Sequence, residues 1–163
     1  MICLTLINEF KNEYEFLSNF FSTDVVLFGL RFKTAEAAFQ AGKAIVSQNK
    51  SALDTILSTE PDQAGKAKHI GRNIKMSQNE LVYWDEIKVT WMGEVIRCKF
   101  FQNQILAALL LRTRPTPLVE GNHWGDVFWG VDLSTGLGEN HLGKILMTVR
   151  DLLAMYNIIK SRN

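Results

Sequence analysis

Apolar residues recur at helical spacing over most of the chain, and a strand-like pattern is confined to its N-terminal part. Residues 24–33 (DVVLFGLRFK) are rich in β-branched and aromatic side chains, which predicts a short β-hairpin that turns near Gly29. An alanine-rich segment then predicts a helix to about Ser47, with Thr34 as its N-cap. A second helix is expected over about 50–58.

Helix start and stop signals continue in the middle of the chain. Pro61 fits the first turn of a short helix that Gly71 would close. Ser77 and Glu80 form a capping box, and the apolar residues after it keep helical spacing as far as Ile96. The middle of the chain is therefore predicted to be helical throughout.

The C-terminal part predicts two more helices separated by a loop region. One covers about 103–112, and the other runs from Leu142 to about Ile159, with Asn140 as its N-cap. Residues 118–129 are expected to hold short strands around a glycine-rich loop. Because strands do not alternate with helices, we expect a mainly α (α+β) fold, compact and single-domain over 1–163, with a small N-terminal hairpin and short β segments.

Composition and charge agree with a globular protein of one domain. The chain has 163 residues, of which 47% are hydrophobic and 21% charged. The formal net charge of +1 gives no strong field toward nucleic acid or an acidic membrane, so local groups must hold any anionic ligand. No apolar run approaches the roughly 18 residues of a membrane span, and the start lacks the pattern of a secretory signal. We therefore expect a cytoplasmic protein without a membrane partner.

The cysteines and histidines give no metal or disulfide pattern. Cys3 and Cys98 match neither a zinc site nor a disulfide framework, so both are expected to be buried free thiols. His69, His123 and His141 are scattered and form no HExxH motif. No metal and no cofactor are expected.

Three polar residues share one stripe of the predicted helix that follows Thr34. Glu36, Gln40 and Lys43 are spaced i, i+4 and i+7, and most other positions there are small or apolar. One interpretation is a core helix with a thin solvated face. The other is a carboxylate and an amine that project into a pocket, where burial would lower the amine's pKa and the carboxylate would raise it. A lysine tuned in this way can act as a nucleophile through a Schiff base.

A glycine-rich segment before the last predicted helix is a second candidate. Gly136, Gly138 and Asn140 would let backbone N–H groups approach an anion at a helix N-terminus. An ordinary turn with an Asn cap explains the pattern equally well. The spacing is not GxGxxG, so neither a Rossmann nor a P-loop fingerprint is present.

Aromatic rings and loop acids are a third candidate group. The rings of Phe20, Trp84 and Trp129 could stack on a base, although Phe20 and Trp84 would belong to the core in most proteins. Asp126 and Glu120 lie near the same loop as Trp129 and could serve a glycosidic reaction as acid and charge stabiliser. Isolated loop acids are more commonly just solvated.

These motifs occur in an order that resembles the YbiA-like, or NADAR, family. The resemblance runs from about residue 8 to residue 153. The matching segments are Phe16–Phe20 (FLSNF), Thr34–Lys43 (T-x-E-x-x-FQA-x-K), Gly71–Arg72, Trp84–Asp85, Lys99–Phe100, Leu118–Glu120 with Asp126 and Trp129–Gly130, and Gly136–Arg150 (G-x-G-x-N-x-LG-x-x-LM-x-x-R).

The resemblance implies a compact, mostly helical enzyme that hydrolyses an N-glycosidic bond at ribose C1′. Two small-molecule substrate classes are associated with the family: phosphorylated ribosylamino-pyrimidine intermediates of riboflavin synthesis, and ADP-ribose attached to a base such as guanine. It also turns the polar stripe into an expected active site. Glu36, Lys43 and Asp126 are then the catalytic candidates, as acid/base, as ribose ligand or nucleophile, and as charge stabiliser.

The remaining matched residues are expected to bind substrate. Trp84 and Trp129 would shape the pocket or stack in it, and Arg72 and the loop at Gly138 would hold phosphate. The full set of substrate-binding candidates is Asn19, Phe20, Gln40, Arg72, Trp84, Trp129, Gly130, Gly138 and Asn140.

Other functions would use only part of the predicted active site. A non-catalytic module for ADP-ribose or another nucleotide would keep the pocket without the chemistry, yet both Glu36 and Lys43 are present. An enzyme acting on ADP-ribosylated DNA or RNA would need a local basic patch such as Lys66, Lys68 and Arg72. A helical interaction protein would need an exposed apolar face. The sequence does not determine the oligomeric state.

Overall fold

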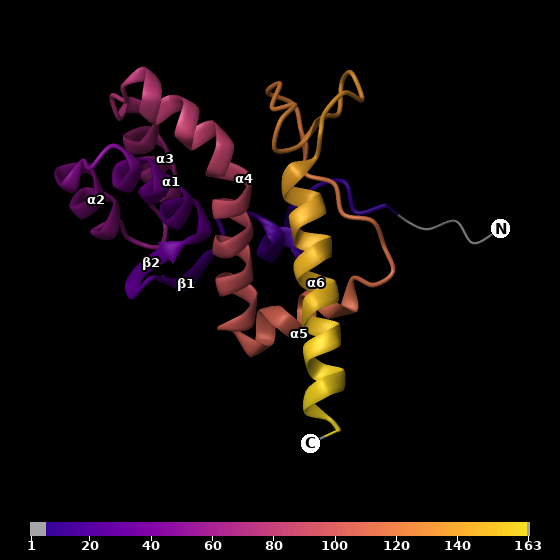
Figure 1. Cartoon of the computed structure of the whole chain (residues 1–163). Helices are drawn as coiled ribbons and strands as arrows, with labels where there is room; N and C mark the ends of the chain where they lie inside the picture. Colours follow the sequence, from indigo (N-terminus) through magenta and orange to yellow (C-terminus); the bar gives the residue numbers. More distant parts are fainter. Residues whose placement is uncertain (1–5, 163) are drawn as a thin grey trace. The chain divides into compact units, whose positions relative to one another are not determined.

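The computed structural model describes residues 6–162, which divide into two compact units. The central unit is Asn19–Gln102, and the terminal unit combines the described residues of Met1–Ser18 and Asn103–Asn163. Each unit is built mainly of helices with one pair of short strands, which confirms the predicted mainly α class (Figure 1). The single domain expected over 1–163 stays a prediction.

The central unit opens with the predicted hairpin. Strands β1 (Ser22–Leu27) and β2 (Leu30–Thr34) are antiparallel. Phe28 and Gly29 connect them, with φ angles of 50° and 80°. Two positive φ values in succession are those of a type I′ turn, whose twist matches that of paired strands. The turn therefore forms at Gly29 as predicted.

Helix α1 (Ala35–Val46) follows β2 directly and is the structural centre of this unit. Thr34 caps it as predicted, because its Oγ1 accepts a hydrogen bond from Ala37 N at 3.1 Å. The alanines of α1 are almost fully buried. Their small size lets three helices pack closely around α1 (Figure 1): α2 (Lys50–Leu57), α3 (Ala64–Asn73) and α4 (Gln78–Phe101). Glu36 and Lys43 are thus carried by the best-enclosed helix of the unit.

Helix α3 (Ala64–Asn73) differs at both ends from the prediction. It begins three residues after Pro61, which lies in the preceding turn, and it continues past Gly71. Gly71 does not have the positive φ of a helix-terminating glycine. It is instead buried in the helix, where the space for its absent side chain is occupied by the side chain of Gln40 from α1.

Helix α4 (Gln78–Phe101) begins with the predicted capping box. Glu80 Oε2 accepts from Ser77 N at 2.6 Å, and Ser77 Oγ accepts from Glu80 N at 3.4 Å. Two tryptophans of α4 pack on α1 at Gly42, where an added Cβ would lie 2.7 Å from both Trp84 Cζ3 and Trp91 Nε1. A glycine is therefore needed at position 42 for this helix pair to approach.

The terminal unit contains a 3-10 helix η1 (Asn12–Leu17), helices α5 (Gln104–Arg112) and α6 (His141–Lys160), and two short strands. Strands β3 (Gly121–Asn122) and β4 (Val131–Asp132) pair in parallel. The sequence predicted both helices and placed short strands within 118–129, where β3 lies. Strand β4 follows that range by two residues.

Asn140 precedes α6 as predicted, but it does not cap the helix with its side chain. Its backbone is left-handed (φ 53°), and no cap hydrogen bond forms. The side chain instead joins two points of the chain, since Nδ2 donates to Leu118 O at 2.9 Å and Oδ1 accepts from Glu120 N at 3.0 Å. The residue type was expected for a cap, and here the amide holds the loop before β3 against the start of α6.

Two buried residues of α4 complete the description of the core. Cys98 is a buried free thiol, as predicted, and Cys3 lies outside the described residues. Lys99 is fully buried, which lowers its pKa to about 7, and its Nζ lies 5.2 Å from the centroid of the Phe100 ring.

None of the helices within residues 6–162 combines the length and the apolar character that a membrane crossing requires.

Candidate active site

The carboxyl group of Glu36 lies inside the central unit, in the first turn of α1. The residue is only 6% exposed. Gln40, one turn later, donates from Nε2 to Glu36 Oε1 at 2.8 Å. The backbone N–H of Glu36 donates to Asn19 O at 2.9 Å, which joins the segment before the hairpin to α1. The interpretation of this stripe as a solvated face therefore does not hold for Glu36 and Gln40.

Burial raises the pKa of the Glu36 carboxyl above its ordinary value, because removal from water disfavours the charged form. The Gln40 hydrogen bond and the positive charges of Lys68, Lys43 and Arg72 oppose this effect. The raised pKa follows because desolvation is the largest of these influences. A carboxyl in such surroundings is suited to carry a proton that it can donate.

Lys43 lies two turns from Glu36 on the same helix and is half-buried. Burial lowers the pKa of its amine. The carboxylates of Glu36 and Asp85 raise that pKa again, and the cations of Arg72 and Lys88 lower it further. The amine is therefore biased toward its neutral form, in which nitrogen can act as a nucleophile.

Two charged residues of α4, Asp85 and Lys88, also act on Lys43. The sequence did not indicate that either residue belongs to the site of Glu36 and Lys43. Lys88 Nζ pairs with Asp85 Oδ1 at 2.7 Å. Both act on the pKa of Lys43. Their i, i+3 spacing was visible in the sequence, but such pairs are common on helix surfaces, and only the packing of α4 on α1 reveals the connection.

Two amide side chains beside Glu36 have buried acceptor atoms. Gln40 is 4% exposed and Asn19 9% exposed. Asn19 Nδ2 lies 3.5 Å from Met92 Sδ, a weak acceptor. Within the part of the chain that the structure describes, Asn19 Oδ1 and Gln40 Oε1 have no hydrogen-bond partner. A buried acceptor without a partner is costly in a fold, and a catalytic or binding role is one of the physical reasons for such an atom.

The aromatic candidates of the central unit differ in accessibility. Trp84 is 5% exposed, and its ring centroid lies 5.3 Å from that of Phe39, so it belongs to the core. Phe20 is 43% exposed and has Lys68 Nζ 5.4 Å from its ring centroid. Of these two candidates, Phe20 offers the ring surface on which a flat ligand could stack.

Asp126, the third catalytic candidate, belongs to the terminal unit. Its Oδ1 accepts hydrogen bonds from Phe128 N at 3.2 Å and from Trp129 N at 2.9 Å. Asn122 steadies the same loop, donating to Asp126 O at 2.7 Å and accepting from Asp126 N at 3.0 Å. These bonds give Asp126 a structural role in the turn, and its catalytic role stays a prediction.

The glycine-rich segment before α6 is closely packed. A Cβ at Gly138 would lie 2.6 Å from Val131 Cα. The N–H groups of Glu139 and Asn140 donate to Val127 O at 2.7 Å and to Gly130 O at 3.2 Å. These two amides serve the fold, so phosphate binding at the Gly138–Asn140 loop stays a prediction that this geometry does not favour. Trp129 packs edge-on against Phe128 at 5.0 Å and is partly buried.

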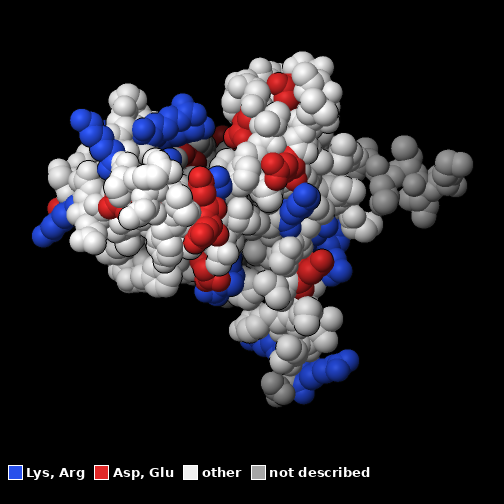
Figure 2. Space-filling view, turned by 45° about the horizontal axis from the view of Figure 1, so that its top comes forward, with Lys and Arg blue, Asp and Glu red and all other residues white. Residues whose placement is uncertain are grey.

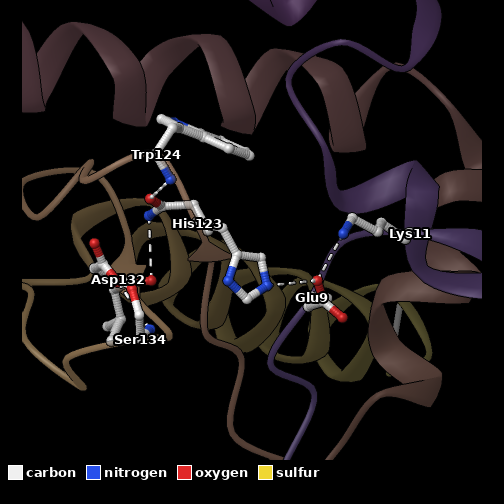
Figure 3. A network of polar contacts seen from close by, with 8 residues as sticks. Glu9, Lys11, His123, Trp124, Asp132 and Ser134 are labelled. Atoms are coloured by element: carbon white, nitrogen blue, oxygen red, sulfur yellow. Dashed lines mark hydrogen bonds and ion pairs between the residues drawn. The ribbon is translucent and has the colours of Figure 1, made fainter.

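The histidine of this loop region contacts a carboxylate. Figure 3 shows the His123 ring directed toward Glu9, with His123 Nε2 3.9 Å from Glu9 Oε1, which also pairs with Lys11 at 2.7 Å. Asp132 accepts from the hydroxyl and the backbone N–H of Ser134 nearby.

Among residues 6–162, no three or more His, Cys, Asp or Glu side chains are grouped so that they could hold a metal ion.

Surface charges of both signs are mixed. On the face shown in Figure 2, Lys and Arg side chains are interspersed with Asp and Glu. Exposed charges also pair locally, as Arg97 does with Glu94 at 2.8 Å. This distribution agrees with the net charge of +1. The cations that act on Glu36 are three residues of the central unit, Lys43, Lys68 and Arg72.

The structure thus brings the predicted residues together in two groups. The central unit contains seven of them: Asn19, Phe20, Glu36, Gln40, Lys43, Arg72 and Trp84. The terminal unit contains the other five: Asp126, Trp129, Gly130, Gly138 and Asn140. Glu36 and Lys43, the two predicted catalytic residues whose pKa values are shifted, both lie in the central unit. It is therefore the better candidate for the chemistry.

Comparisons with known proteins match nearly the whole chain. The profile of the NADAR domain family matches residues 7–154. An N-glycosidase YbiA of Shigella boydii serotype 4 is 34% identical over 153 residues, covering 93% of this chain and 90% of the relative. A riboflavin biosynthesis protein of Vibrio vulnificus is 35% identical over 148 residues, covering 89% of this chain and 38% of that protein. The NMR structure of Escherichia coli YbiA matches with a TM-score of 0.80 at 31% identity, covering 97% of this chain and 90% of its own.

Proposed function

This chain belongs to the NADAR domain family, and we propose that it is an N-glycosidase that hydrolyses the bond between a base-like group and a phosphorylated ribose. The substrate class we favour is the ribosylamino-pyrimidine phosphates of riboflavin synthesis. Two relatives support this choice by name, one as an N-glycosidase and one as a riboflavin biosynthesis protein.

The observation that carries the proposal is the buried carboxyl of Glu36. Breaking a C1′–N bond leaves negative charge on the departing base and positive charge on the ribose ring, so a proton donor at the base accelerates the reaction. Glu36 is held out of water and has a raised pKa, which favours its protonated form relative to a carboxyl in water. We assign it the role of general acid.

Two roles are open to Lys43, and we favour covalent catalysis. In its neutral form the Nζ lone pair bonds to C1′ as the electrons of the C1′–N bond leave with the base, which takes the proton of Glu36. A proton of the attached amine then passes to the ring oxygen O4′ as the C1′–O4′ bond breaks, which gives a protonated Schiff base. Water hydrolyses this Schiff base to ribose phosphate and the free amine of Lys43, and the proton released returns to the Glu36 carboxylate. In the alternative, Lys43 binds a ribose hydroxyl and water attacks C1′.

The phosphate is assigned to the cations of α3. Arg72 is exposed and Lys68 half-exposed, and both act electrostatically on Glu36, so both are near the acid. A guanidinium binds phosphate with paired hydrogen bonds, which suits Arg72. The exposed ring of Phe20 beside Lys68 is assigned to contact with the base.

A substrate panel tests the proposal. Purified protein is offered ribosylamino-pyrimidine phosphates, NAD, ADP-ribose and ADP-ribosylated guanosine, and the free base is measured by mass spectrometry. We expect fastest base release from the ribosylamino-pyrimidine phosphates. Release from ADP-ribosylated guanosine alone would replace the substrate class by ADP-ribosyl groups, and tight binding of ADP-ribose with no base release from any compound would show a binding module instead.

A further inference from the structure

Gly71 of α3 lies directly against the side chain of Gln40. A Cβ built at position 71 would be 2.6 Å from Gln40 Cδ and 2.8 Å from Gln40 Cβ, and closer still to Gln40 Oε1. Real Cβ atoms essentially never approach other heavy atoms this closely. Any side chain at position 71 must therefore displace the Gln40 amide or push α3 away from α1.

The Gln40 amide has little freedom to avoid such a collision. Gln40 is 4% exposed, so it cannot turn outward into solvent without leaving its buried position. Its Nε2 donates to Glu36 Oε1 at 2.8 Å, and its Oε1 faces Gly71 without a hydrogen-bond partner among the described residues. One buried amide therefore connects the glycine of α3 to the carboxyl of α1.

We propose that Gly71 is a positioning residue for Glu36: its lack of a side chain leaves the space in which the Gln40 amide lies and donates a hydrogen bond to the Glu36 carboxyl. This inference rests on the proposed function only in the use that it gives to Glu36. The geometry itself, glycine to amide to carboxyl, is independent of any substrate.

The hydrogen bond from Gln40 changes the pKa of Glu36. That bond favours the ionised carboxylate and lowers the pKa of Glu36, against the raising effect of burial. The charged groups of the central unit that face Glu36 are Lys43 of α1 and Lys68 and Arg72 of α3, and all three also lower this pKa. Loss of the amide contact should therefore raise the pKa of Glu36 while these three cations stay in place.

The test is a carboxyl titration of Gly71→Ala by carbon-13 NMR, without substrate. The Glu36 signal is assigned by its absence from the Glu36→Gln spectrum. We expect its titration midpoint to rise by about one pH unit or more, the effect of losing a hydrogen bond to a charged group. An unchanged midpoint in folded Gly71→Ala protein would overturn the proposal.

Gly65→Ala is the matched control. Gly65 lies in the same helix, and a Cβ there would meet nothing within 4 Å. It should leave the Glu36 midpoint unchanged. A shift as large as that of Gly71→Ala would show that glycine replacement in α3 acts generally and would contradict the proposal.

The double variant Gly71→Ala/Gln40→Gly separates positioning from general damage. Gln40→Gly removes Oε1, Cδ and Cβ, the three atoms nearest to a Cβ at position 71, so the double variant should titrate like Gln40→Gly alone. If Gly71→Ala does not fold, the comparison is made by thermal unfolding: Gln40→Gly should restore folding in the Gly71→Ala background. A further midpoint shift, or continued failure to fold, would overturn the inference.

The same experiment distinguishes this inference from the proposed activity. If no compound of the substrate panel releases a base but Gly71→Ala still raises the Glu36 midpoint, the positioning holds and the glycosidase assignment fails. If bases are released and the midpoint does not move, the activity holds and Gly71 has no part in positioning the acid.

Discussion

Gln40 Nε2 donates a hydrogen bond of 2.8 Å to Glu36 Oε1 on one face of α1, and both residues are almost fully buried. Helical spacing places them one turn apart, and the packing of α3 and α4 on α1 removes them from water. The pair therefore combines a local sequence pattern with a tertiary environment that changes its chemistry. Its consequences can be measured separately for stability and for catalysis.

Replacing Glu36 with Gln should stabilise the protein at pH values above 4.5. The folded state raises the pKa of Glu36 above 4.5, so below pH 4.5 both folded and unfolded states hold the proton. As pH rises from 4.5 through the folded pKa, the unfolded state ionises first and the wild type loses stability. Glu36→Gln avoids this loss and should gain about 0.5–2 kcal/mol at pH 7. Urea unfolding at pH 4 and pH 7 measures the difference, and an equal or larger gain at pH 4 would contradict this account.

The covalent role of Lys43 predicts an adduct that can be trapped. Burial favours the neutral amine, so borohydride added during turnover should reduce a Schiff base. A peptide containing Lys43 should then gain the mass of ribose phosphate less one oxygen atom, because condensation removes water and reduction adds two hydrogen atoms. Lys43→Arg should give no adduct and lose nearly all activity, because its guanidinium stays charged. Substantial activity in Lys43→Arg, with no adduct in the wild type, would leave only the ribose-binding role.

Packing at Gly42 should be sensitive to a single methyl group. Gly42→Ala forces a Cβ into the rings of Trp84 and Trp91 and should cost about 1–3 kcal/mol of unfolding free energy. Gly93 of α4 is the control, since a Cβ there meets nothing within 4 Å. Gly93→Ala should stabilise by about 0.5–1 kcal/mol through helix propensity. Similar unfolding midpoints for the two variants would show that the tryptophans do not restrict position 42.

The bridging role of Asn140 predicts that its amide is needed as a donor. Asn140→Asp keeps an acceptor but places a carboxylate against Leu118 O, and it should cost about 1–3 kcal/mol. Asn49 caps α2 through its Oδ1 at 3.0 Å from Ala52 N, so Asn49→Asp should change stability by less than about 0.5 kcal/mol. If Asn140→Asp is tolerated as well as Asn49→Asp, position 140 is an ordinary cap.

Local signals in the sequence were sufficient for most of the secondary structure. The hairpin turn at Gly29, the Thr34 cap and the capping box at Ser77 depend on neighbouring residues only, and each is confirmed. Gly71 and Asn140 were assigned as helix stop and helix cap because those are the usual roles of glycine and asparagine. Their actual roles depend on Gln40 and Leu118, which are distant in sequence, so no local pattern could reveal them.

The candidate site was predictable only in part for the same reason. The spacing of Glu36 and Lys43 indicated a shared face, but spacing cannot tell a solvated face from a buried one. Packing by α3 and α4 decides this and adds Lys68, Asp85 and Lys88 to the cluster. At Asp126 the sequence could not show that backbone N–H groups already occupy Oδ1.

The measurement that tests the central claim most directly is base release by Glu36→Gln compared with the wild type. Both proteins are incubated with the best substrate of the panel at pH 7, with unfolding midpoints recorded on the same samples. We expect the variant to be at least as stable as the wild type and to release base about 10²–10⁴-fold more slowly, the usual contribution of a general acid. Base release at the wild-type rate by the stable variant would contradict the assignment of Glu36 as the acid.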